Sequence, residues 1–134
     1  MQSSAQAATF LMFEGRAEEA ARFYVSLFPD GRIDAMTRYG PGEPGPEGTV
    51  MHGAFTLGGQ RFMCSDSFVS HGFGFTPSVS IFVTCAEASE TDRLFAALSD
   101  GGVVMMPLDS YPFSRRFGWV QDRFGVSWQL SLGA

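Results

Sequence analysis

Residues 115–132 have the sequence RRFGWVQDRFGVSWQLSL, and this stretch decides the fold of the chain. Its second half alternates between apolar and polar residues, which indicates a β-strand with one face toward a core. We therefore predict a hairpin: a strand through Phe117 and Trp119, a turn at 122–125, and a strand at 126–132. On the last strand the apolar face comprises Val126, Trp128, Leu130 and Leu132, and the polar face comprises Ser127, Gln129 and Ser131.

A second copy of this arrangement lies at residues 49–66, which have the sequence TVMHGAFTLGGQRFMCSD. This stretch also has a strand pattern on each side of a glycine turn. Aligning Gly59 with Gly125 matches Arg61 with Ser127, Phe62 with Trp128, Met63 with Gln129 and Cys64 with Leu130. The repeat indicates a chain built from two similar modules.

The segments before each hairpin repeat as well. The first half predicts a strand at 9–13, a helix at 14–28, a strand at 32–39, a Pro/Gly-rich loop at 40–48 and the hairpin. The second half predicts a strand at 78–84, a helix at 87–99, a short strand at 103–106, a loop at 107–114 and the final hairpin. Each half is thus β-α-β-β-β, which gives an α+β fold whose two helices cover one sheet face. We expect a loose tail at 1–8 and one domain at 9–134, with modules at about 9–66 and 78–132.

The composition excludes several classes of protein. Hydrophobic residues make up 45% of the 134 residues and charged residues 17%, so the chain can bury a core. The net charge of −5 argues against a nucleic-acid partner, and no apolar run approaches a membrane span. The beginning lacks a signal-peptide pattern, so we expect a cytoplasmic protein. We expect Cys64 and Cys85 to be buried, reduced thiols rather than a disulfide pair.

The chain resembles a known superfamily on several of these segments. They are FLMFEG at 10–15, AEEAARFY at 17–24, LFP at 27–29, FTP at 75–77 and DRFGVSWQ at 122–129. These segments and the duplicated β-α-β-β-β order resemble the vicinal-oxygen-chelate superfamily of glyoxalases, bleomycin-resistance proteins and dioxygenases. The closer resemblance is to its PhnB-like branch, named for a 3-demethylubiquinone-9 3-methyltransferase domain. The resemblance implies a curved mixed sheet around a cavity with the helices outside, and a homodimer.

The resemblance also implies where a metal ion would bind. In the metal enzymes of the superfamily, the ligands come from the first and last strands of each module. The corresponding residues here are Thr9, Met63, Ser80 and Gln129. Only Gln129 offers a good oxygen donor, because a thioether is soft and neutral hydroxyls bind divalent ions poorly. We therefore expect neither a metal nor another cofactor.

The cavity that this resemblance implies would be largely apolar. The apolar lining residues are Leu11, Phe13, Met63, Phe82 and Trp119, and the polar ones are Thr9, His52, Ser80 and Gln129. His52 is the candidate catalytic residue, as a general base or an orienting group. The alternative is a partly buried strand histidine that hydrogen bonds satisfy. Trp119, together with Tyr111 and Phe113, fits either an aromatic lid or core packing.

Three functions remain open at this point. The first is a metal-independent site for a small molecule, with or without a reaction. The second is a ligand-sequestering protein of the bleomycin-resistance type, and the third is a metal-dependent isomerase, lyase or dioxygenase. S-adenosylmethionine methyl transfer is disfavoured, because the prolines of the Gly-rich segment 40–45 prevent a following helix N-terminus.

Overall fold

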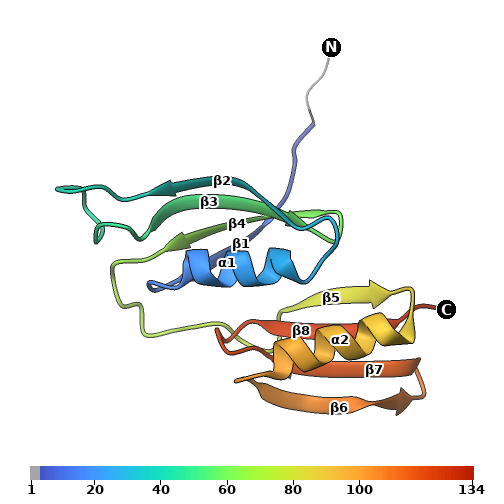
Figure 1. Cartoon of the computed structure of the whole chain (residues 1–134). Coiled ribbons are helices and arrows are strands. Elements are labelled where there is room, and N and C mark those ends of the chain that lie inside the picture. Colours follow the sequence, from blue (N-terminus) through green and yellow to red (C-terminus); the bar gives the residue numbers. More distant parts are fainter. Residues whose placement is uncertain (1–3) are drawn as a thin grey trace. The chain divides into compact units, whose positions relative to one another are not determined.

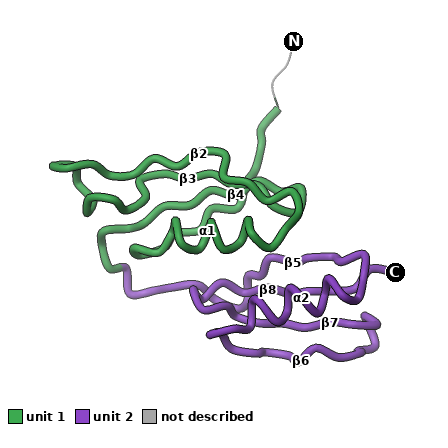
Figure 2. The backbone as a smooth tube through the Cα atoms, viewed as in Figure 1, with its two compact units in different colours: residues 1–70 green, residues 71–134 purple. Residues whose placement is uncertain are grey.

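The computed structural model describes residues 4–134, which divide into two compact units with the boundary between residues 70 and 71 (Figure 2). Unit 1 contains β1 (Thr9–Phe13), α1 (Ala17–Ser26), β2 (Arg32–Arg38), β3 (Val50–Leu57) and β4 (Gln60–Asp66). Unit 2 contains β5 (Ser80–Cys85), α2 (Ala88–Ser99), β6 (Val103–Tyr111), β7 (Ser114–Gln121) and β8 (Ser127–Leu132). The duplicated β-α-β-β-β order is confirmed, and the unit boundary lies in the segment between β4 and β5.

Each unit contains its own four-stranded mixed sheet. The strand order is β1-β4-β3-β2 in unit 1 and β5-β8-β7-β6 in unit 2, so the two sheets have the same topology. The first strand of each unit pairs in parallel with the last, and the other neighbours are antiparallel. In each unit the helix packs against one face of its own sheet (Figure 1). We call the opposite face of each sheet its helix-free face.

The core of unit 1 lies between α1 and the sheet. Helix α1 has small residues on its buried face, where Ala17, Ala20 and Ala21 are fully buried beside Tyr24. On the sheet, Phe55 and Phe62 stack with ring centroids 5.3 Å apart, and Tyr24 lies 6.3 Å from Phe55. The tight β3–β4 turn needs the two glycines Gly58 and Gly59, because both have positive φ. Asp30 accepts both of their backbone N–H groups at 2.8 Å.

The core of unit 2 is built around Trp128, which is fully buried as predicted. Its indole N–H donates to the buried carboxylate of Asp122 at 2.9 Å, so the polar edge of the ring is satisfied inside the core. Gly118 lets α2 approach β7, because a Cβ at this position would lie 2.4 Å from the ring of Phe95. The core of unit 2 also contains four buried aliphatic side chains, those of Val120, Leu94, Leu98 and Leu130.

The loop predicted at 107–114 is wrong, because β6 continues to Tyr111 and β7 begins at Ser114. The pairing of β6 with β7 is shifted at several points between Val104 and Tyr111. β6 is an end strand, so Pro107 can occupy it without removing a central ladder hydrogen bond. Helix α1 also begins at Ala17 rather than at residue 14.

The structure also bears on the cysteines and on the expected lack of a membrane span. Cys64 and Cys85 are both buried and unpaired with each other, as expected. Among residues 4–134, no helix is long and apolar enough to cross a membrane.

Candidate functional site

The helix-free face of unit 2 brings together four of the residues that the sequence predicted for a ligand site. The pairing of β5, β8 and β7 places Phe82 opposite Gln129, and Gln129 opposite Trp119. Ser80 lies opposite Ser127 in the adjacent row on the same face. The alternation of β8 was therefore interpreted correctly, since the opposite face holds Trp128 in the core.

A chain of hydrogen bonds joins the polar side chains on this face. The Trp119 indole N–H donates to Ser127 Oγ at 2.8 Å, and the oxygens Ser127 Oγ and Ser80 Oγ lie 2.7 Å apart. The amide nitrogen of Gln129 donates to Ser80 Oγ at 3.1 Å. Both hydroxyls also lie near the carbonyl oxygen of Pro77, at 3.4 Å from Ser80 and 3.5 Å from Ser127. We call Ser80, Trp119, Ser127 and Gln129 the amide network.

The amide network has the chemistry of a binding site. One arrangement of donors satisfies all three contacts: Trp119 donates to Ser127, Ser127 to Ser80, and Ser80 to the carbonyl of Pro77. Neither serine donates to a histidine or a carboxylate within this network, so neither hydroxyl has the neighbouring base that a nucleophilic serine needs. The amide oxygen of Gln129 accepts no hydrogen bond from the described residues, and one N–H of the amide also remains available.

The strand-face prediction for β1 is wrong. Thr9 pairs with Phe62 and Leu11 with Cys64, so both lie on the face that α1 covers, and Leu11 is buried. Phe13 is buried on that face as well. Because a one-residue shift moves every side chain of a strand to the opposite face, Phe10 and Met12 occupy the helix-free face instead.

The pairing also corrects the match between the two modules. Phe10 pairs with Met63 as Phe82 pairs with Gln129, so the residue that corresponds to Ser80 is Ala8. Position 8 has no side-chain donor for a metal or a ligand.

Met63 and His52 lie on the helix-free face of unit 1, as predicted. Met63 pairs with Ala54, and His52 pairs with Thr37. His52 is exposed and has no side-chain hydrogen bond to the described residues, so the partly buried, hydrogen-bonded alternative is wrong. Neither a carboxylate nor a second imidazole contacts it there to orient the ring as a general base.

The donors do not fit a divalent metal site. Nowhere in residues 4–134 do three or more His, Cys, Asp or Glu side chains come together to hold a metal ion. With Ala8 in place of Thr9, the four positions supply an amide, a hydroxyl, a thioether and, at Ala8, no donor. Without a carboxylate or imidazole, this set offers little to offset the dehydration of zinc, nickel or iron.

Sequence reasoning missed Ser127 and the Pro77 carbonyl as members of the site. Ser127 was placed on the correct face, and its alternation with Gln129 could have identified it. The Pro77 carbonyl carries no sequence signal, because its role depends on the path of the backbone before β5. Of the arginines before the final hairpin, Arg116 forms an ion pair with Asp92 on α2, and Arg115 donates to the carbonyl of Gly133 at 3.2 Å.

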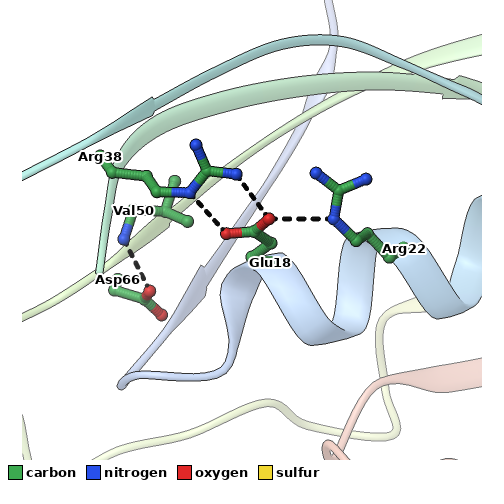
Figure 3. Close-up of polar contacts among 5 residues, drawn as sticks. All are labelled: Glu18, Arg22, Arg38, Val50 and Asp66. Carbon is green, nitrogen blue, oxygen red and sulfur yellow. Dashed lines mark hydrogen bonds and ion pairs between the residues drawn. The ribbon is translucent and has the colours of Figure 1, made fainter. Parts of the chain in front are cut away.

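Unit 1 contains a buried carboxylate with a structural role. Asp66 accepts the backbone N–H groups of Gly15 at 2.8 Å, Ala17 at 2.9 Å and Val50 at 2.9 Å. Figure 3 shows its contact with Val50. Asp66 thereby joins the start of α1 to the start of β3, so it fixes the β1–α1 connection as well as its own strand end.

A nearby ion cluster fixes α1 to the end of β2 (Figure 3). Glu18 pairs with Arg38 through two hydrogen bonds of 2.8 and 2.6 Å, and with Arg22 at 2.9 Å. The hydrogen bonds from Arg38, helped by Arg22, lower the pKa of Glu18 to about 2.

Comparison with known proteins identifies the family. A sequence model of the family described as 3-demethylubiquinone-9 3-methyltransferase matches residues 5–131. The chain belongs to this family. A solved structure of a PhnB protein from Bacillus cereus, whose description gives the same family name, is 54% identical, with a TM-score of 0.94. That match covers 96% of this PhnB-like chain and all of the other.

Other relatives agree with this assignment. A structure from Pseudomonas aeruginosa is 32% identical over 96% of this chain and 98% of its own, with a TM-score of 0.83. A Mycobacterium bovis protein is 30% identical over 124 residues, which are 85% of this chain and 74% of that protein. A glyoxylase/bleomycin resistance protein/dioxygenase domain from Frankia, at 16% identity and a TM-score of 0.66, shows that the PhnB-like chain has this superfamily's fold.

Proposed function

We propose that this PhnB-like protein binds a small organic molecule on the helix-free face of unit 2, and that it does so without a metal ion. The observation that supports this proposal is the amide network, in which four polar side chains are held by one another and one amide edge remains available. Small-molecule sites typically combine an apolar lining with a few fixed polar groups. Phe82 and Trp119 provide that lining on either side of Gln129.

The same geometry favours binding over turnover. Ser127 donates to Ser80, and Ser80 donates to a backbone carbonyl, so no group there is arranged to accept a proton from a substrate. This supports the ligand-sequestering alternative of the bleomycin-resistance type over an isomerase, lyase or dioxygenase. His52, which lies in unit 1, is not needed for this activity.

The activity in the family name has little support from the chain itself. Methyltransferases of the common type use a parallel sheet with a Gly-rich turn that leads into a helix. Each sheet here has one parallel pair, and the Gly-rich segment at 40–48 leads into strand β3. We therefore propose no methyl transfer.

Metal independence can be tested by thermal denaturation of the full chain. A ligand that binds only the folded state must raise the melting temperature. We expect no change after chelation or after addition of nickel, zinc or manganese, because the donor set lacks a carboxylate and an imidazole. A stoichiometric metal that survives dialysis would contradict this part of the proposal, and its loss in His52→Ala would identify a ligand that the geometry does not suggest.

Binding itself can be tested by native mass spectrometry of protein purified at low salt, followed by extraction of any retained molecule. We expect an unmodified ligand whose retention falls in Gln129→Leu and persists in His52→Ala. Retention that is unchanged in Gln129→Leu would show that the amide network is not the site.

A further inference from the structure

We propose that the molecule bound on unit 2 is a neutral, planar heteroaromatic compound with an amide-like edge, held between Phe82 and Trp119 and recognised by Gln129. This inference rests on the proposed function and specifies the chemical class of its ligand. Three features of the helix-free face support it: the positions of the two aromatic side chains, the free groups of the amide, and the absence of charge in the site.

Two aromatic side chains flank Gln129 in one row across the sheet. Phe82 on β5 and Trp119 on β7 lie in one row, with β8 and Gln129 between them. Neighbouring strands are about 4.8 Å apart, so β5 and β7 are separated by about 10 Å. Gln129 occupies the row between the two rings, so a ligand ring that lies over Gln129 can contact both aromatic side chains.

The two aromatic side chains are available in different ways. Phe82 is 58% exposed, so its side chain is accessible to a ligand on this face. Trp119 is half-buried, and its only polar group donates to Ser127 at 2.8 Å. It can therefore offer a ligand only its ring surface, while the hydrogen bond fixes the orientation of that ring.

The amide of Gln129 is oriented for recognition. Its nitrogen donates to Ser80 at 3.1 Å, and this bond leaves the carbonyl oxygen and one N–H without a partner among the described residues. A ligand with an adjacent donor and acceptor, such as a lactam, satisfies both. A ligand that lacks this edge leaves buried polar groups without a partner, which is costly.

The site has no charge with which to neutralise an ionic ligand. The side chains of the site are all neutral between pH 5 and 9; they are Phe82, Trp119, Gln129, Ser80 and Ser127. Transfer of an unpaired charge onto this face would cost far more than transfer of a neutral ring. Affinity for the proposed class should accordingly be independent of pH across this range.

The test uses calorimetric titration of the full chain with three probes. Isocarbostyril is an aromatic bicyclic lactam, N-methylisocarbostyril lacks its donor, and caprolactam keeps the amide edge without an aromatic ring. We expect isocarbostyril to bind most tightly, with a loss of about tenfold for N-methylisocarbostyril, the size expected when one hydrogen bond is lost. We expect a loss at least as large for caprolactam, which cannot stack.

Matched variants locate the contact. Gln129→Leu should weaken isocarbostyril about tenfold and remove its preference over the N-methyl probe. Phe82→Ala should weaken both aromatic probes about fivefold, while Thr84→Ala, on the same face of β5, should leave all affinities unchanged. The Trp119 indole N–H signal, assigned with Trp119→Phe, should shift with bound probe in nuclear magnetic resonance spectra.

Three outcomes would overturn the inference, and they differ in what they imply for the proposed function. If caprolactam binds as well as isocarbostyril, or if Gln129→Leu and Phe82→Ala bind like the unmodified chain, the ligand class is wrong. If the probes fail while a retained ligand of another class depends on Gln129, the ligand class is again wrong and the proposed function stands. If neither the probes nor any retained ligand depends on Gln129, the proposed function itself fails.

Discussion

At the scale of single residues, the buried carboxylate of Asp66 joins separate segments of unit 1. It accepts three backbone N–H groups, and the donors come from the β1–α1 connection and from the start of β3. Its partners lie up to 51 residues away in the sequence, so no local motif identifies it as a structural residue.

Removing the Asp66 carboxylate should destabilise unit 1. We expect Asp66→Ala to lower the free energy of unfolding by about 3 kcal/mol, because each unpaired buried N–H costs about 1–3 kcal/mol and water can satisfy part of the loss. The measurement is a urea titration, with exposed Asp100→Ala as control. A loss below about 1 kcal/mol would mean that the three N–H groups find other partners.

Glu18 should give the chain a specific pH dependence. Its pKa is about 2 in the folded state, against an ordinary value of 4.5, so the folded state favours the charged form. This stabilisation is fully present above pH 4.5 and is lost as the pH falls toward 2. The difference in denaturation midpoint between the unmodified chain and Glu18→Gln should therefore be constant near neutrality and shrink below pH 4.5.

Arg38→Gln provides the control for this experiment, because Arg38 is the main cause of the shift. Its effect should follow the same pH profile. A difference between unmodified chain and Glu18→Gln that stays constant down to pH 2 would contradict the role of the ion cluster.

At the scale of single elements, strand β8 supports both the core and the candidate site. Trp128 is fully buried on one face, while Gln129 belongs to the amide network on the other. The sequence predicts both roles, because the alternation along this strand has no exception. β1 behaves differently: its sequence TFLMF is apolar at every position but the first, so no alternation distinguishes its two faces.

Trp128→Ala should therefore be strongly destabilising. We expect a loss of about 3–5 kcal/mol, the usual cost of truncating a fully buried large aromatic side chain. Phe113→Ala is a suitable control, because Phe113 is 65% exposed, and it should change stability little. Equal losses for both variants would place Trp128 outside the core of unit 2.

The end strands also differ in how well they are protected from further pairing. β2 and β6 have register shifts against their neighbours, and β6 contains Pro107, features that discourage the addition of another strand. β1 and β5 have regular parallel pairing on one side only, with Phe10 and Phe82 exposed. These irregularities explain why β6 was predicted too short: Pro107 resembles a strand terminator unless the strand is known to be at an edge.

At the scale of the whole molecule, we propose that the chain forms a homodimer through the β1 and β5 edges. An unprotected edge strand is a template for pairing, and closed pairs with two-fold symmetry are the commonest assembly of soluble chains. Light scattering at tens of micromolar should give twice the chain mass of 14.6 kDa. A Phe10→Lys variant should shift the mass toward the monomer, whereas a monomeric mass for the unmodified chain would refute the proposal.

Each unit contains one buried cysteine, so thiol labelling can report the unfolding of each unit separately. Cys64 is fully buried in unit 1 and Cys85 in unit 2. Burial, with a contribution from Asp66, raises the pKa of Cys64 to about 11, and burial also raises that of Cys85. Both thiols are thus protonated at neutral pH and react with a maleimide only when their unit opens. Labelling rates measured separately for the two thiols will differ if the duplicated halves unfold independently, and will coincide if they unfold as one cooperative body.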